Sequence, residues 1–588
     1  MGFLSSAKSP AGDTNDVTET VQTSPSPRDT GDVADHDKKE GSDGENGSEG
    51  YQAGVRGVEA AATVWTKWHL VAAYTFIWLI YFVTSTEEVV VRVFNPYVTS
   101  AFQLHSLTAA TNIMASIIGG LSKLPLAKLL DTWGRPQGLA LALFLWIIGF
   151  IMMAVCRNVQ TYAAAQVFSA VGAQGVSYCV TVFIADTSAL RNRALMLSFA
   201  TSPYIVTTWI GGPMADSLLA GPGWRWGFGI FAIITPVVVL PLCFLFIWSQ
   251  IKAKKANILP ETRTKLTWAG VKKYMIEIDL IGIILLAGGM ALFLLPFSLY
   301  SYQHEKFRSA MIICMIVFGG LLLIAFVLYE KYLAPVKFIP VSLLADRTVF
   351  FGGMMFLFVF FNSMVWGSYF TSMLLVAWNQ SVTKATYISN IYRVGSCFSA
   401  LVIGVFIRWS GRFKWVALYF GLPLMTLGVG LLIHFRQPDT PIGYVIMTQI
   451  FIAFAGGPLV IAGELAMMAP SDHQHIAVIM AILDLFGSFG TALGATVSAA
   501  IWTTVFPAAL RRHLPPTARI DRIYSSLTLQ LAYPVGNPTR AGISLAYGDA
   551  QKYMLITSTC ALGVAFLCVL LWRDIKITDK RQVKGLVV

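Results

Sequence analysis

Charged side chains are scarce in this sequence. Asp, Glu, Lys and Arg make up 13% of the 588 residues, whereas a soluble globular domain carries about 25%. Hydrophobic residues make up 55%, and the mean hydropathy is +0.63. This balance is typical of a polytopic membrane protein and not of a soluble domain.

Several chemical motifs are also missing. The seven cysteines show no CxxC spacing and nearly all lie in apolar runs, so they predict neither a metal site nor a disulfide framework. There is no phosphate-binding Walker loop, and we expect no enzymatic activity, no cofactor and no protein-bound metal. The net charge is +12, but the basic residues lie between apolar runs and do not form the cluster that nucleic-acid binding requires.

What the sequence does contain is a series of long apolar runs. From Trp68 onward, about 14 segments reach the roughly 20 residues that a membrane-spanning helix needs. Their expected limits are Trp68–Val89, Leu107–Leu130, Gly138–Val155, Tyr162–Ala185, Leu195–Leu218, Gly227–Gln250, Leu280–Tyr300, Ala310–Tyr329, Thr348–Leu374, Ala385–Ile407, Trp415–Phe435, Gly443–Ala466, Ile476–Val505 and Tyr553–Trp572. Lys and Arg concentrate in alternate connections, which places both termini in the cytoplasm.

One hairpin carries a recognisable turn. Between the second and third runs the chain reads Ala127-x-x-x-Asp131-x-x-Gly134-Arg135. This resembles the Gly-x-x-x-Asp-x-x-Gly-Arg signature of the major facilitator transporters, with Ala127 in place of the first Gly. A weaker copy runs from Gly404 to Arg412, with Arg408 in place of Asp131, and parallel half-repeats are what the facilitator fold requires.

The resemblance implies an all-α membrane protein with the major facilitator fold and about 14 transmembrane helices. Two six-helix halves would flank two inserted helices. The composition of the first segment, poor in aromatics, predicts disorder. The expected segments are a disordered cytoplasmic tail (1–66), the first half (67–250), a basic cytoplasmic loop (251–277), the inserted helices (278–332), the second half (333–572) with a long extracellular loop (506–552), and a cytoplasmic C-terminal tail (573–588).

Further stretches narrow the resemblance. They are Ile184–Arg193, Trp209–Pro213, Gly223–Phe228, Tyr302-Gln303 and Ala546–Met554. Together they resemble the fungal siderophore–iron transporter family, which implies proton-coupled import of ferric hydroxamate-type siderophores across a fungal plasma membrane or endosomal membrane. We expect a monomer in the lipid bilayer. The alternatives are a proton-coupled exporter of the same layout, for multidrug or glutathione antiport, and a nutrient sensor that does not transport.

Ionisable groups inside membrane spans are costly and usually functional. Asp484 lies among apolar residues, and Glu87 and Glu88 lie at the outer end of the first span. These three carboxyl groups are the candidates for proton coupling. Asp484 could instead be a structural partner of a Lys or Arg on another helix. The two glutamates could instead lie at a solvated helix end. Glu464 lies near a helix end, where we expect solvation by the interface.

The remaining candidates divide into three sets. A pocket for a bulky chelate needs aromatic walls and hydrogen-bonding groups, with packing as the alternative role for each residue. The pocket candidates are Arg393, which could instead pair with Asp484 or reach the membrane surface, and Gln166, Tyr178, Tyr204, Trp209, Trp366, Tyr369, Tyr387 and Asn390. The extracellular-loop candidates for capture or gating are Tyr533, Arg540 and Tyr547, with a folded cap as the alternative. By family analogy the cytoplasmic gate comprises Asp131, Gly134, Arg135, Asp186, Arg191 and Arg193, in which Asp186 could pair with Arg191 or Arg193.

Overall fold

The computed structural model describes most of the chain beyond the expected N-terminal tail. The described residues are 65–101, 107–132, 134–256, 268–299, 305, 308–335, 344–471, 476–525 and 527–577. The expected tail at 1–66 lies almost wholly outside them, as do Tyr302 and Gln303. For Asp131 the backbone lies in a helix, but its side chain is outside the described part.

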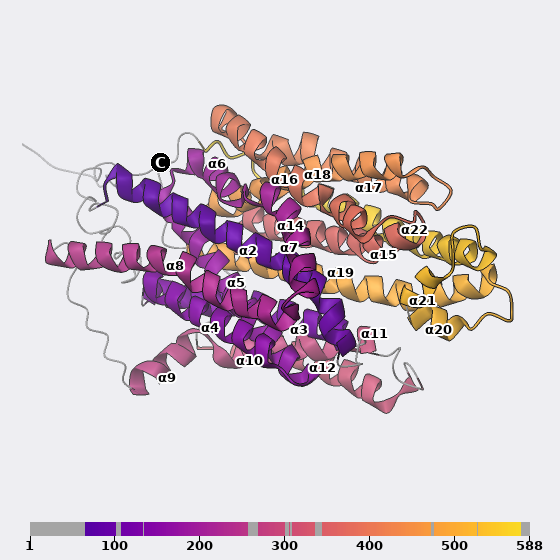
Figure 1. Ribbon diagram of the computed structural model, residues 1–588. Helices are drawn as coiled ribbons and strands as arrows, with labels where there is room; N and C mark the ends of the chain where they lie inside the picture. Colours follow the sequence, from indigo (N-terminus) through magenta and orange to yellow (C-terminus); the bar gives the residue numbers. More distant parts are fainter. Residues whose placement is uncertain are drawn as a thin grey trace, which may run out of the picture. The chain divides into compact units, whose positions relative to one another are not determined.

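Helices dominate all described segments (Figure 1). The first half comprises α2 (Lys67–Ala101), α3 (Leu107–Thr132), α4 (Arg135–Val155), α5 (Val159–Thr187), α6 (Leu190–Thr201), α7 (Tyr204–Ala220) and α8 (Gly223–Lys255). Next come α9 (Trp268–Glu277), α10 (Leu280–Leu294), α11 (Pro296–Leu299) and α12 (Ala310–Tyr332). The second half comprises α14 (Arg347–Gly367), α15 (Phe370–Val376), α16 (Val382–Ser410), η4 (Val416–Gly421), α17 (Leu422–Phe435), α18 (Ile442–Met468), α19 (Ile476–His513), α20 (Ile520–Ser525), α21 (Leu527–Ala532) and α22 (Pro538–Leu570).

Each expected membrane span coincides with one helix or with two successive helices. Within the described residues, eleven helices are long and apolar enough to cross a membrane by length and composition. The expectation of an all-helical membrane protein is therefore confirmed, while the count of 14 spans stays a prediction.

Four expected spans consist of two successive helices, and two of these divide at residues that explain the interruption. The fifth span divides into α6 and α7 at Ser202 and Pro203, because proline has no N–H to continue the helical hydrogen bonds. The ninth span divides into α14 and α15, where Tyr369 adopts a left-handed φ of 57°. Such a φ is rare for a residue with a side chain, so this bend is a specific feature of the second half.

The two halves repeat one packing pattern. In the first half α2 packs on α7 and α8, α3 on α5, and α4 on α5 and α8. In the second half α14 packs on α19 and α22, α16 on α18, and α17 on α18 and α22. When the six spans of each half are numbered in order, these five pairs are the same in both halves. Between the halves, α3 meets α19 and α16 meets α6 and α7, again as equivalent pairs. Parallel repeats of this kind characterise the major facilitator fold.

The segment expected as a long extracellular loop is more helical than predicted. Helix α19 continues to His513 and α22 begins at Pro538, so both helices extend into residues 506–552. The short helices α20 and α21 lie between them, at the end of the bundle opposite to the start of α2 (Figure 1). A separate apolar core that includes Phe506, Ile543 and Tyr547 holds this part together. We call residues 514–537 the cap.

Glycines allow close helix packing in both halves. A Cβ atom at Gly490 in α19 would lie 2.1 Å from the backbone oxygen of Leu357 in α14. At Gly457 in α18 it would lie 2.0 Å from the backbone oxygen of Ser396 in α16. Small residues that let backbones approach are a main source of helix association in lipid, so these contacts fix the second half.

We predict that Gly490→Ala lowers the free energy of unfolding by about 1–3 kcal/mol, the usual cost of overpacking. Backbone atoms of α14 cannot move aside as a flexible side chain could. The control is Gly430→Ala in α17, where a Cβ atom would meet nothing within 4 Å. Thermal unfolding of both variants in detergent measures the difference, and equal stability would contradict this account of the helix contact.

Candidate functional site

A cavity of about 390 Å³ lies between the two halves. This volume falls within the range of about 300–1,000 Å³ that is usual for small-molecule sites. We call it the central cavity. Its wall is lined by Tyr81, Thr181, Leu197, Thr201 and Tyr204 of the first half and by Phe360, Tyr392, Arg393, Ser396, Cys397, Ala400, Gly456, Gly457, Val460, Ile461 and Glu464 of the second half.

Arg393 and Tyr204 are the predicted pocket residues that reach this cavity. The Arg393 guanidinium lies over the Tyr204 ring, 4.5 Å from its centroid, an arrangement that stabilises a cation in a poorly solvated site. Arg393 also forms an ion pair with Glu88 of α2. The pair joins the two halves. Arg393 of the second half is thus in contact with two residues of the first half, Tyr204 and Glu88.

The other predicted pocket residues do not line the central cavity. Tyr178 is buried in the core of the first half. Tyr369 stacks on Trp502, with ring centroids 3.9 Å apart, and Asn390 donates a hydrogen bond to the Thr386 carbonyl at 3.0 Å. Ring contacts also engage Trp209 with Tyr387, and Trp366 with Tyr392. For these residues the observed contacts are packing contacts.

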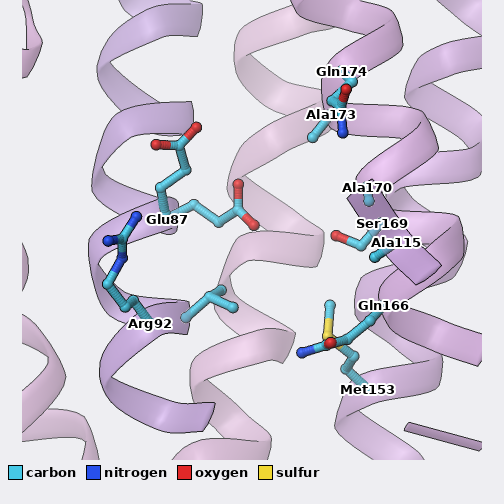
Figure 2. A pocket seen from close by; sticks show the side chains of 11 residues that line it. Glu87, Arg92, Ala115, Met153, Gln166, Ser169, Ala170, Ala173 and Gln174 are labelled. Atoms are coloured by element: carbon cyan, nitrogen blue, oxygen red, sulfur yellow. The ribbon is translucent and has the colours of Figure 1, made fainter. Parts of the chain in front are cut away.

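A second cavity of about 480 Å³ lies within the first half. We call it the first-half cavity. Figure 2 shows Glu87 and Arg92 on one wall, with Ser169, Ala173 and Gln174 on the opposite wall. The full lining comprises Glu87, Glu88, Val91, Arg92, Ala115, Met153, Gln166, Ser169, Ala170, Ala173 and Gln174. Gln166, predicted for the pocket, therefore lines this cavity.

Glu87 is the most isolated of the predicted proton-coupling groups. Its residue is 6% exposed, and within the described residues its carboxyl group has no hydrogen-bond or ion-pair partner. An ionised carboxylate buried without a partner is strongly disfavoured. The site therefore suits a carboxyl group that carries a proton.

Asp484 has a partner that the sequence did not indicate. Its carboxylate lies 3.0 Å from Nζ of Lys123, which joins α19 to α3 and thus the second half to the first. The sequence suggested Arg393 as a partner, but Arg393 pairs with Glu88. The apolar run Leu107–Leu130 contained the missed signal, because a lysine within a membrane span requires a counter-charge.

Glu464 differs from its sequence-based expectation. Its position near the end of α18 predicted solvation at the membrane interface. The structure places Glu464 on the wall of the central cavity, where its Oε2 atom is buried and, in the described part of the chain, has no hydrogen-bond partner. It is a candidate for cargo contact or proton transfer that sequence reasoning set aside.

Arg436 is a second residue that the sequence placed differently. It follows the expected span Trp415–Phe435, where a short connection between spans would expose it, yet its side chain is fully buried at the end of α17. Its Nη1 donates to the Trp366 carbonyl at 2.6 Å and to Oε1 of Gln551 at 2.9 Å. The guanidinium also lies 4.1 Å from the Phe370 ring centroid. Arg436 thus ties α17, α14 and α22 together.

The cytoplasmic gate candidates form two groups of contacts. Nε of Arg135 lies 3.0 Å from the Asp186 carboxylate, and both side chains are buried. The backbone supports this pair, because Gly134 adopts a φ of 111° that favours glycine and Arg135 also donates to the Leu130 carbonyl. Arg135 is thus a partner of Asp186 that the sequence did not suggest. Arg193, which the sequence did suggest, also interacts with Asp186 through its charge.

Arg191 and Arg193 contact the opposite half. Nε of Arg191 donates to the Arg408 carbonyl at 2.9 Å, and Nη1 of Arg193 lies 3.7 Å from Sδ of Met468. Nη2 of Arg193 also donates to the Ala185 carbonyl at 2.9 Å. These contacts hold α6 against α16 and α18, so they must change if the halves separate on this side.

The extracellular-loop candidates support the cap. Arg540 is buried and donates to the carbonyls of Leu375, Val376, Gln530 and Tyr533 at 2.8–3.3 Å. The Tyr547 hydroxyl donates to Oε1 of Gln530 at 3.0 Å. Tyr533 takes part through its backbone carbonyl. These contacts match the alternative of a folded cap and leave a role in capture as a prediction.

Comparison with known proteins now gives the class of this protein. Residues 77–377 match the model of the Major Facilitator Superfamily, and the chain belongs to that superfamily. A crystal structure of a bacterial homologue of the iron transporter ferroportin, in an outward-facing state with soaked iron, superimposes with a TM-score of 0.50 at 11% identity, covering 86% of this chain and 99% of that chain. That likeness shows the fold alone.

The relatives identify the family within the superfamily. An MFS siderochrome iron transporter of Ajellomyces capsulatus is 56% identical over 532 residues, which are 90% of this chain and 90% of the relative. A siderophore iron transporter of Emericella nidulans is 38% identical over 90% of this chain and 88% of the relative. The chain belongs to the fungal siderophore–iron transporter family. Its relatives are named as transporters, which agrees with the expectation that it is not an enzyme.

We predict that Arg135→Gln lowers the free energy of unfolding by about 3–5 kcal/mol, the usual cost of removing one member of a buried ion pair. Adding Asp186→Asn removes the other charge of this pair and should recover part of the loss. Denaturant unfolding in detergent measures both single variants and the double variant. If the double variant is as unstable as the sum of the two single variants, the ion pair does not account for the stability.

Proposed function

We propose that this protein imports ferric siderophores of the hydroxamate type, together with protons, by alternating access. The observation that carries the proposal is the 56% identity, over 90% of both chains, to a relative named as a siderochrome iron transporter. The cavity between the two halves supports it, because alternating access in this fold exposes a site between rocking halves.

Cargo recognition would rest on the central cavity. Its wall offers the Arg393 guanidinium, the Glu464 carboxyl group and the hydroxyl groups of three tyrosines, two threonines and one serine among apolar side chains. Iron would travel within its chelator, which already fills the coordination of the metal. The protein would then supply hydrogen bonds and apolar surface and need not supply metal ligands.

Proton coupling would use the carboxyl groups Glu87, Glu88 and Asp484. Glu87 and Glu88 line the first-half cavity, and Asp484 lies in the first turns of α19, toward the expected cytoplasmic side. This distribution supports proton entry at the glutamates and release at the aspartate. The Lys123 ammonium beside Asp484 would serve as the counter-charge of the ionised aspartate.

The cytoplasmic gate would control access from the inside. The contacts of Arg191 and Arg193 with the second half would close the cytoplasmic side, and the Arg135–Asp186 pair would hold the first-half turn in place. We propose that the protein acts as a monomer in a fungal plasma membrane or endosomal membrane, with both termini in the cytoplasm.

The deciding experiment measures accumulation of radiolabelled iron in fungal cells that lack their own siderophore importers and express this protein. We expect accumulation with at least one ferric hydroxamate siderophore from a panel, and a decrease when an uncoupler removes the proton gradient. Iron supplied as a simple salt is the control. Faster loss of preloaded siderophore would favour an exporter, and binding without accumulation would favour a sensor.

We predict that Asp484→Asn abolishes uptake driven by the proton gradient while expression stays intact. Removing the base as well, with Lys123→Gln, tests whether the pair is only structural. If the pair is only structural, the double variant should largely regain uptake because no buried charge remains. If Asp484 carries the proton, uptake should stay lost in the double variant. Recovery of gradient-driven uptake in the double variant would exclude Asp484 from coupling.

A further inference from the structure

An ion pair connects the walls of the two cavities. Glu88 lines the first-half cavity, Arg393 lines the central cavity, and the two side chains form an ion pair with each other. Both residues are partly exposed, with 40% of the Glu88 side chain and 22% of the Arg393 side chain accessible. A change in the charge of Glu88 would therefore act directly on a group in the wall of the central cavity.

Glu87 supplies the second observation. It is buried in the wall of the first-half cavity and lacks a partner among the described residues. The charged and titratable groups facing this region are Glu88 and Arg92 on α2, Arg393 on α16 and the Tyr204 hydroxyl on α7. The lining from α3, α4 and α5 is uncharged. Arg92 also lines the cavity, but the carboxylate that acts on it is that of Glu88. Glu87 therefore lies beside a carboxylate and uncharged walls, where a carboxyl group holds its proton.

We propose that Arg393 exchanges partners, between Glu88 when that carboxylate is ionised and an oxygen atom of the cargo when Glu88 is protonated. This proposal rests on the proposed function and adds its regulation. A proton passes from the Glu87 carboxyl group to the Glu88 carboxylate, which becomes neutral, and Glu87 takes up another proton through the first-half cavity. Arg393 keeps its charge and turns to the central cavity.

The exchange also defines a class of cargo. A guanidinium is a planar donor that binds two acceptor oxygens side by side, and such charge-assisted hydrogen bonds are stronger than neutral ones. The Tyr204 ring beneath Arg393 holds its plane in place. The site therefore takes ferric chelates that expose carbonyl or carboxylate oxygens next to one another, and protonation of Glu88 strengthens their binding.

The first test measures binding of a ferric trihydroxamate to the purified full chain by calorimetry at about pH 5 and about pH 8. We expect binding by the natural protein to be about 5- to 10-fold tighter at the lower pH, a usual size for coupling between two sites. The Glu88→Gln variant should bind with the low-pH affinity at both values. The control is Asp216→Asn, an exposed residue outside both cavities, which should keep the natural pH dependence.

The second test needs no cargo. Infrared spectra at the same two pH values detect the carbonyl band of a protonated carboxyl group, and we expect Glu87→Gln to lack one such band that the natural protein shows. Unchanged bands in Glu87→Gln, or a natural pH dependence in Glu88→Gln, would overturn the exchange. If the bands behave as expected but no ferric siderophore binds or accumulates, the proposed function fails and the exchange onto such a cargo falls with it, while the protonated state of Glu87 stands.

Discussion

The structure depends on one constraint: a charge inside a membrane bundle needs a partner of opposite sign or access to a polar cavity. Among the described residues, two ion pairs meet this constraint across the halves, Glu88 with Arg393 and Lys123 with Asp484. Each half supplies one acid and one base to these pairs. If the halves moved apart, each half would be left with an unpaired acid and an unpaired base. Any rocking motion must therefore provide each of these four groups with a new partner.

Close helix packing determines where such motion can occur. Within each half the same five helix pairs are in contact, and glycines such as Gly457 and Gly490 bring backbones too near for a side chain. Between the halves, contact concentrates on α3 with α19 and on α16 with α6 and α7. The halves thus behave as rigid bodies, and changes in charge act at the contacts between them. The Lys123–Asp484 pair lies within one of these contacts.

Local features of the sequence predicted the fold well, but they could not predict which residues of different helices are in contact. Hydropathy located the spans because the length of a membrane helix is set by the bilayer. It could not pair Asp484 with Lys123, since nothing in a single sequence states which helices meet. Glu464 was set aside because it lies one turn before the end of α18, yet neighbouring helices cover that end. Tyr547 was assigned to a loop that is largely helix.

The two hairpin turns differ in a way that burial explains. In the first, Arg135 pairs with Asp186, and their side chains are 6% and 1% exposed. In the second, Arg412 pairs with Asp574, and theirs are 56% and 48% exposed. Exposed pairs contribute about 0–1 kcal/mol, whereas breaking a buried pair costs about 3–5 kcal/mol. Both turns have a glycine with a positive φ before the arginine, but the strong electrostatic constraint lies in the first. The second turn contributes the Arg408 carbonyl that Arg191 contacts, so of the two turns the first carries the stronger electrostatic constraint.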